Sequence, residues 1–241
     1  MSENVLENII KKKIEKIDNL KKSIDLKKLD KLIQKNKSYI NFKDKIENNL
    51  KENKTSIIAE IKKASPSAGV IIEDYNPVEI ANIYLKNNAT CLSVLTEEDY
   101  FLGNLIHISK IKDKVNLPIL CKDFFIDTFQ VALAKSFGAD CILIILSAVD
   151  NQLAKDLYET ANELNISTLI EVHSTKEAEQ ALSFENSLIG INNRNLDTLK
   201  ISLNTTVDLV KIVDSHKNPL VCESGIKSVD DIENIIVNSG I

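Results

Sequence analysis

Short apolar runs alternate with longer amphipathic segments along the chain after residue 54. Runs of this length are typical of strands, whereas apolar positions that recur every three or four residues are typical of helices. Strands are expected at Ser56–Ile61, Cys91–Leu95, Pro118–Cys121, Cys141–Leu146, Ser167–Val172, Ser187–Ile191 and Pro219–Cys222. Helices are expected at Val78–Asn87, Leu105–Lys114, Thr128–Phe137, Gln152–Asn165, Lys176–Ser183, Thr205–Val213 and Val229–Val237. This alternation predicts parallel strand–helix–strand units whose apolar strands are covered on both faces.

A closed barrel fits these units better than an open sheet does. The first strand is followed by Lys-Lys-Ala-Ser-Pro-Ser-Ala-Gly, which lacks the GxGxxG pattern of a nucleotide-binding open sheet. We therefore predict an α/β fold, a (β/α)8 TIM barrel with an N-terminal helical extension. Seven strands are recognisable. The sequence reaches Asn238-Ser-Gly-Ile241 where the eighth strand is expected to begin, so that strand is predicted to be truncated.

The segment before the first strand is helical and rich in lysine. Its apolar positions keep a helical period from Val5 to Leu50. We expect residues 1–54 to be a helical extension that packs on a barrel formed by residues 55–241, the whole being one domain. A basic segment can indicate nucleic acid, but these lysines alternate with isoleucine and acidic residues, as on a solvated helix face. Arg194 is the only arginine, so the chain lacks the bidentate guanidinium groups that usually bind nucleic-acid phosphates. No nucleic-acid partner is therefore expected.

Composition limits the chemistry further. The four cysteines lie in separate apolar runs, which indicates core positions in a reducing compartment. The three histidines share no metal-binding motif, so no metal site is expected. The longest apolar run, Cys141–Leu146, is far shorter than the roughly 20 residues of a membrane helix. With a polar N-terminus this predicts a cytoplasmic protein without a membrane partner.

Polar residues recur at the ends of five expected strands. Side chains two apart in a strand point the same way, so each of these strands ends with polar residues on a face whose previous occupant is apolar or glycine. They are Glu60 and Lys62, Lys122, Glu171, Asn192 and Glu223. Each one alone could mark where a strand leaves the core. Together they would meet at the carboxyl-end mouth of a barrel, where active sites of this fold lie, and interleaved lysines and glutamates can supply acids and bases.

A turn after the seventh strand is a candidate phosphate site. Ser224-Gly225-Ile226 precedes an expected helix. Glycine lets backbone N–H groups approach an anion there, and Lys62 could supply a countercharge.

At these residues the sequence resembles the indole-3-glycerol phosphate synthase family. The matching stretches are IIAEIKKASPSAGVI (57–71), SVLTEEDYFLG (93–103), PILCKDFFID (118–127), LIEVH (169–173), IGINNRNLDTL (189–199) and ESGI (223–226). They follow one another in the order of the seven strands, and the resemblance as a whole covers nearly the whole chain.

The resemblance implies a carbon–carbon lyase of tryptophan biosynthesis that needs no cofactor. Its small phosphorylated substrate would be 1-(2-carboxyphenylamino)-1-deoxyribulose 5-phosphate, which closes to a ring and loses carbon dioxide and water. Lys122 would be the general acid that activates the ribulose carbonyl, and Glu171 an acid/base partner in dehydration. Glu60 and Lys62 would complete the proton transfers, with Lys62 also holding anionic groups. Which lysine serves which step stays open.

The resemblance also implies substrate-binding residues. Asn192, Arg194 and Glu223 would orient the substrate, with Ser224 and Gly225 near its phosphate. Phe101 and Phe124 would offer apolar surface to the aromatic ring, and a core role for either stays open. Ser65 lies in the loop after the first strand, where a mobile lid is expected.

Departures from the family pattern keep alternatives open. Ala68 stands where the family often has lysine, and Cys222 where it often has alanine. The expected truncation removes a second phosphate-binding turn. Alternatives are therefore an incomplete or inactive barrel that needs a complementing partner, and another phosphosugar barrel such as phosphoribosylanthranilate isomerase. Association with other tryptophan-pathway enzymes, or self-association through open barrel edges, is the corresponding partner expectation.

Overall fold

A single parallel sheet organises the protein in a computed structural model that describes residues 5–35, 39–196 and 198–239. Its seven strands follow the order β1-β4-β5-β6-β7-β8-β9. They are β1 (Ile58–Ile61), β4 (Cys91–Leu95), β5 (Ile119–Lys122), β6 (Cys141–Ile145), β7 (Ser167–Val172), β8 (Leu188–Asn192) and β9 (Leu220–Glu223). Neighbouring strands pair in parallel throughout. The predicted barrel-type α/β fold is confirmed, and each strand lies within two residues of its expected position.

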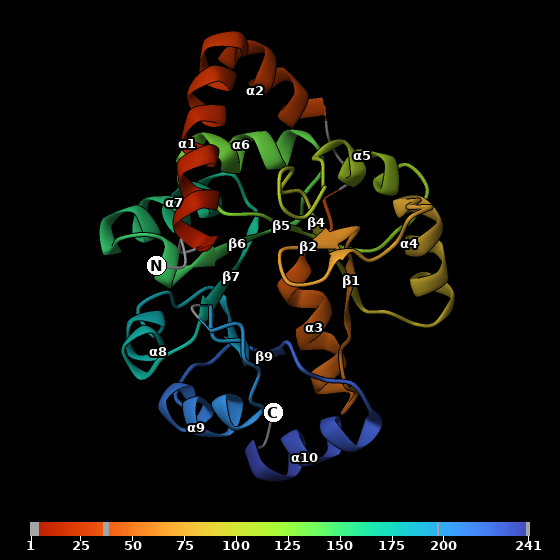
Figure 1. Ribbon diagram of the computed structural model, residues 1–241, viewed down its shortest axis with the longest axis vertical. Coiled ribbons are helices and arrows are strands. Elements are labelled where there is room, and N and C mark those ends of the chain that lie inside the picture. The colour runs from red at the N-terminus through yellow and green to blue at the C-terminus, as the bar shows by residue number, and fades with distance from the viewer. Residues whose placement is uncertain (1–4, 36–38, 197, 240–241) are drawn as a thin grey trace.

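Helices surround the sheet, which curls about a central axis (Figure 1). They are α4 (Pro77–Lys86), α5 (Ile106–Lys112), α6 (Thr128–Ser136), α7 (Asn151–Glu163), α8 (Thr175–Ala181), α9 (Asn204–Val213) and α10 (Val229–Ser239), with a short 3-10 turn at Leu146–Ala148. Side-chain caps fix several helix starts. Asn76 accepts the N–H groups of residues 78 and 79 ahead of α4, and Asp127 with Gln130 forms a capping box on α6. These caps therefore mark where α4 and α6 begin.

Two apolar clusters lie on the two faces of the sheet. The larger one fills the layer between strands and outer helices and includes Ile61, Leu92 and Ile142. The smaller one lies inside the barrel and includes Cys91, Leu120, Leu143, Leu169 and Leu188. Strand residues therefore alternate between the two clusters, as the period of two requires. The positions that follow the inner cluster along each strand point into the mouth.

Helix α3 (Phe42–Lys51) covers the amino ends of the strands. Phe42 and Ile46 pack into the inner cluster, and Phe42 is fully buried. Lys43 donates to Asn186 and Asn218, which precede β8 and β9. This end of the barrel is therefore filled, which leaves the carboxyl end for chemistry.

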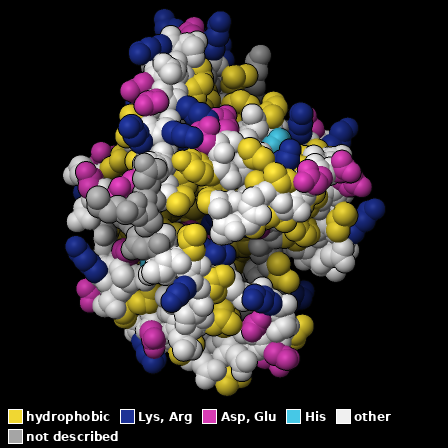
Figure 2. Space-filling model, in the orientation of Figure 1, with side chains coloured by type: hydrophobic (Ala, Val, Ile, Leu, Met, Phe, Trp, Pro, Cys, Tyr) yellow, Lys and Arg dark blue, Asp and Glu magenta, His cyan; other side chains and the backbone are white. Residues whose placement is uncertain are grey.

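Helix α1 (Val5–Ser23) and helix α2 (Leu26–Lys35) pack against α6 through Ile17, Leu29 and Phe129. The lysines of α1 differ from the expected solvated face. Lys13 is buried, and Lys16 lies within ion-pair distance of two acidic residues of the loop after β4. Figure 2 shows basic and acidic side chains interleaved over these helices. The prediction of a solvated lysine face is therefore partly wrong, because Lys13 and Lys16 pair with acidic residues from distant segments of the chain.

Two further features were not expected. A small hairpin, β2 (Ala64–Ser65) with β3 (Gly69–Val70), forms within the loop after β1. Asn238 and Ser239 belong to α10 rather than to the beginning of a strand, whereas residues 240 and 241 lie outside the described residues. Strands β1 and β9 form the two edges of the described sheet. No helix among the described residues is long and apolar enough to cross a membrane.

Candidate functional site

Four polar side chains meet at the carboxyl ends of neighbouring strands. Lys122 ends β5, Glu171 lies near the end of β7, Asn192 ends β8 and Glu223 ends β9. The parallel register places Asn192 beside Glu223 and Glu171 beside Gly190. All four follow inner-cluster residues or glycine on their strands, so the alternation of side chains turns them into the mouth.

Lys122 lies at the centre of this group. Its Nζ is 3.1 Å from Glu223 Oε2 and 3.4 Å from Glu171 Oε2, and its side chain is 21% exposed. Burial by itself would lower the pKa of Lys122, but the charges of Glu223, Glu171 and Glu60 raise it above its ordinary value. The ammonium form therefore persists at neutral pH and can act as a proton donor.

Glu171 is held by several donors. Asn192 Nδ2 donates to Glu171 Oε1 over 3.1 Å, and His173 Nε2 lies 3.1 Å from the same oxygen. Burial would raise the pKa of Glu171, yet the Lys122 charge and the contacts with His173 and Asn192 lower it well below the usual range. This carboxylate stays ionised and can serve as a base.

Glu223 has fewer hydrogen-bond donors around it than Glu171 has. Its Oε2 accepts from Lys122, whereas its buried Oε1 has no hydrogen-bond partner among the described residues. Burial and the nearby charge of Glu171 raise the pKa of Glu223 to about 7, against the lowering effect of Lys122. Gly190 makes this position possible, because a Cβ there would lie 2.1 Å from Glu223 Oε1. The two glutamates thus differ in proton affinity while they share one lysine.

Glu60 lies on the edge strand β1, and Lys62 directly follows the end of that strand. Their side chains form an ion pair at 2.5 Å and are each about one-third exposed. The charge of Glu60 contributes to the raised pKa of Lys122, so this pair belongs to the same electrostatic environment.

Two aromatic side chains pack against each other beyond the carboxyl ends of β4 and β5. The rings of Phe101 and Phe124 are 6.4 Å apart between centroids and tilted by 42°. Glu97 holds the loop that carries Phe101, because its carboxylate accepts the backbone N–H groups of Asp99, Tyr100 and Phe101. The first loop is attached here too, since Ala64 N donates to Phe101 O.

The remaining predicted residues lie in three loops. Ser65 is in the hairpin, where its hydroxyl accepts from Ala68 N. Ser224 and Gly225 form a turn after β9 in which both have positive φ angles of 65° and 90°. Arg194 is not drawn into the group around Lys122, because its guanidinium donates to Leu199 O.

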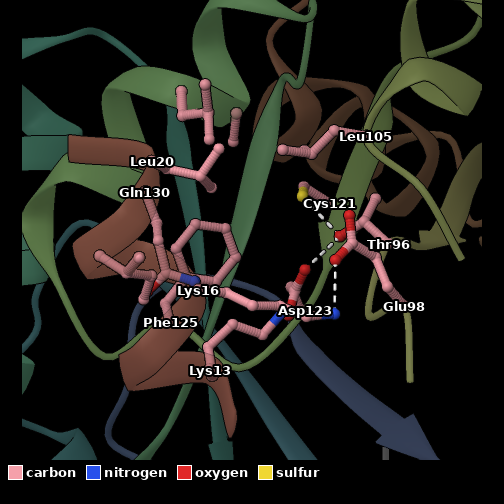
Figure 3. Close-up of a pocket in the computed structure, with 13 residues that line it drawn as sticks. Lys13, Lys16, Leu20, Thr96, Glu98, Leu105, Cys121, Asp123, Phe125 and Gln130 are labelled. Carbon is pink, nitrogen blue, oxygen red and sulfur yellow. Dashed lines mark hydrogen bonds and ion pairs between the residues drawn. The ribbon is translucent and has the colours of Figure 1, made fainter. Parts of the chain in front are cut away.

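A pocket lies between α1 and the strand that carries Lys122 (Figure 3). Lys13 reaches from α1 to Asp123, with 2.7 Å between Nζ and Oδ1, and both side chains are at least nine-tenths buried. Thr96 donates to the other oxygen of Asp123 over 2.7 Å, and Phe124 N donates to Asp123 Oδ1. The residue after Lys122 is thus fixed by the N-terminal helix.

Sequence reasoning missed several residues of this region. His173 stands two positions after Glu171 and so shares its face, a signal that the alternation rule offered. Asn193 donates to the carbonyls of Glu223 and Ser224 and holds the β9 turn. These partners lie 30 and 31 residues away along the chain, and no local pattern marks them. Among the described residues, no group of three or more His, Cys, Asp or Glu side chains is placed to hold a metal ion.

Comparison with solved structures supports the fold. A chain of the tryptophan synthase complex from Pyrococcus furiosus superposes with a TM-score of 0.57, at 14% identity, over 76% of this chain and 83% of the other. A mutant tryptophan synthase alpha-subunit from the same organism gives the same TM-score and identity over 76% and 84% of the two chains. At this identity the likeness shows a shared barrel fold and nothing about activity.

Comparison by sequence is more specific. "Indole-3-glycerol phosphate synthase" from Trichodesmium erythraeum is 39% identical over 99% of this chain and 81% of its own length. The protein of that name from Laribacter hongkongensis is 38% identical over 95% and 87%. The "Tryptophan biosynthesis protein TrpCF" of Buchnera aphidicola is 45% identical over 98% of this chain, which spans about half (51%) of that longer relative. Residues 6–240 match the model of the family described as "Indole-3-glycerol phosphate synthase", and the chain belongs to this family.

Proposed function

We propose that this chain converts 1-(2-carboxyphenylamino)-1-deoxyribulose 5-phosphate to indole-3-glycerol phosphate, carbon dioxide and water. The observation that carries the proposal is the position of Lys122, whose ammonium group lies between two carboxylates of unequal proton affinity at the barrel mouth. Family membership and the three sequence relatives support the same reaction.

Ring closure uses Lys122 as the general acid. The ring carbon that bears the carboxylate attacks the ribulose carbonyl carbon, while the carbonyl oxygen takes a proton from Lys122. Loss of carbon dioxide then returns the electrons of the broken carbon–carbon bond to the ring system. The raised pKa of Lys122 keeps the donor charged until substrate arrives.

Dehydration uses the carboxylates. The new hydroxyl leaves as water after it gains a proton, and Glu171 takes a proton from the substrate so that the double bond of the indole forms. Glu60 and Lys62 complete these transfers, and Lys62 also holds an anionic group of the substrate. The ionised state of Glu171 suits it to the role of base.

The remaining predicted residues are proposed to bind substrate. Asn192 and Glu223 orient the reacting carbons, and the Ser224–Gly225 turn receives the phosphate. Phe101 and Phe124 contact the aromatic ring, and the hairpin with Ser65 covers the mouth. The orienting role of Arg194 rests on the family resemblance alone, since its guanidinium binds Leu199 O in the present conformation.

The longer relative is named a tryptophan biosynthesis protein, which supports a place for this chain in that pathway. We propose on the same ground that the chain associates with other enzymes of the pathway.

The test is turnover of the substrate by the purified chain and by Lys122→Met, followed through indole fluorescence. Loss of a general acid typically costs about 10²-fold or more, so the variant should fall at least that far while its circular dichroism is retained. Exhaustive chelation should leave turnover unchanged, since every step described above uses side-chain acids and bases. Near-normal turnover by Lys122→Met, or none by the unaltered chain, would overturn the proposal.

A further inference from the structure

His173 links the group around Lys122 to helix α8. It follows β7 two residues after Glu171, so the two side chains share a face. One ring nitrogen, Nε2, lies 3.1 Å from Glu171 Oε1, and the other, Nδ1, lies 3.3 Å from Glu177 Oε2. The side chain is 10% exposed. The imidazole is therefore enclosed between two carboxylates.

Glu177 is itself fixed in place. Its Oε2 accepts the backbone N–H of His173 over 2.8 Å, and its Oε1 accepts the Ser174 hydroxyl over 2.9 Å. These two donors hold the Glu177 carboxylate in place, so its Oε2 also contacts Nδ1 and orients the ring. Nε2 lacks an aligned hydrogen bond among the described residues, so its contact with Glu171 is an electrostatic one between close charges.

These surroundings favour the imidazolium form. Burial would lower the pKa of His173, but its contacts with Glu171 and Glu177 raise it to about 9. The charged groups around the pair are Lys122 from β5, Glu223 from β9 and Glu177 from α8, with Glu60 of β1 acting on Lys122. Two cations thus face Glu171, whereas Glu223 has the lysine alone.

We propose that His173 is a positioning residue which, as an imidazolium, holds Glu171 ionised and aimed at Lys122 while Glu223 takes up the shared proton. This inference rests on the proposed function. It explains how two glutamates that share one lysine acquire opposite roles. Glu171 has Lys122, Asn192 and His173 around it, whereas one oxygen of Glu223 finds no hydrogen-bond partner among the residues described. Without the imidazolium, only the neutral amide of Asn192 among these contacts would distinguish Glu171 from Glu223 as the carboxylate that stays ionised.

The kinetic test is the pH profile of kcat/KM for His173→Gln. An opposite charge within a few ångström typically lowers a carboxyl pKa by about 1–3, so its removal should move the acidic limb upward by roughly that amount. Glu177→Gln should move the limb in the same direction by less, because it weakens the imidazolium without removing it. Asp150→Ala is the matched control. It deletes the N-cap of α7, whose side chain accepts Leu153 N, and should lower stability without moving the limb.

A second readout does not depend on turnover. The ring protons of His173, assigned by their absence in His173→Gln, should titrate by NMR with a pKa near 9 in the unaltered chain. In Glu171→Gln this pKa should fall by at least about one. An unmoved acidic limb in folded His173→Gln, or an imidazole that titrates near its ordinary 6.5, would overturn the proposal. Failure of the unaltered chain to turn over substrate, with the NMR result as expected, would count against the proposed function alone.

Discussion

Two buried lysine–carboxylate groups lie at opposite ends of the same sheet. At the amino end, Asp140 precedes β6 and pairs with Lys112 at 2.5 Å. Asp140 also accepts the N–H groups of Ile40 and Ile119 over 2.8 and 2.7 Å and is fully buried. At the carboxyl end, Lys122 lies farther from its partners, at 3.1 and 3.4 Å, and one oxygen of Glu223 has no hydrogen-bond partner in the part of the chain that the structure describes.

The contrast separates a structural site from a chemical one. A buried charge whose hydrogen-bonding capacity is filled binds nothing further, and its function is to join the segments that it contacts. Asp140 joins the segment before α3, the start of β5 and α5. In the group around Lys122, one carboxylate oxygen is still able to accept a hydrogen bond, and the two glutamates differ in pKa. A substrate can use both properties. Residue type does not distinguish the two groups, but their hydrogen bonds do.

The largest effect on stability is expected from Asp140→Ala. The substitution removes the carboxylate that pairs with the buried ammonium group of Lys112, and it removes the acceptor for two backbone N–H groups. Breaking a buried pair from one side typically costs about 3–5 kcal/mol, so urea unfolding should show a loss of that size. The exposed pair of Lys155 and Glu159, 3.8 Å apart, offers the control, and Glu159→Ala should leave the urea midpoint nearly unchanged. A small loss for Asp140→Ala would mean that the amino-end pair is not structural.

Gly190→Ala should damage the carboxyl-end group without removing any of its members. The added Cβ would lie 2.1 Å from Glu223 Oε1 and 3.3 Å from Leu169 Cδ1, so the Glu223 carboxylate must move. A displacement of about 1 Å in a reacting site can cost up to roughly 10²-fold, and we expect kcat/KM to fall by about 10- to 100-fold.

A double-mutant cycle assigns that loss to Glu223. In a Glu223→Ala background the same Gly190→Ala change should cost little more, because the clash is gone. Equal losses in both backgrounds would place the cause elsewhere in β8.

A smaller effect is expected from Glu223→Gln on the pH dependence of stability. The pKa of Glu223 is raised to about 7 in the folded protein, above the roughly 4.3 of an unfolded glutamate. Folding therefore favours the protonated form, and this contribution is present below about pH 4 and lost as pH rises through 7. Relative to the unaltered chain, the Gln variant should gain roughly 1–3 kcal/mol of unfolding free energy between pH 5 and pH 8. If urea unfolding shows that the unfolding free energies of the two proteins change in parallel with pH, the pKa of Glu223 is not raised.

Much of this arrangement could be predicted from the sequence because it depends on short-range rules. The alternation of apolar runs with helical segments located all seven strands, and the period of two placed Lys122, Glu171 and Glu223 on the inner face. The hairpin at Ala64–Val70 was missed, because strands of two residues carry no periodicity.

Pairing across long distances could not be predicted. Lys13 pairs with Asp123, which lies 110 positions later in the chain. The spacing of the lysines in α1 predicts a helix face, but it does not predict which residue pairs with that face. The need for glycine at position 190 depends on the conformation of a side chain in another strand. Arg194 was grouped with the site by resemblance, and only the folded loop shows that its guanidinium binds Leu199 O.

The most direct test replaces Lys122 and Lys112 by methionine, one at a time, and measures turnover and the free energy of unfolding of each variant in one buffer. Lys122→Met should lose about 10²-fold or more in turnover while its unfolding free energy changes much less than that of Lys112→Met. Lys112→Met should lose several kcal/mol of stability, on the order of 3, and keep turnover within about twofold at a temperature where it is folded. If both variants lose turnover and stability in the same proportion, the division between a chemical carboxyl end and a structural amino end is wrong.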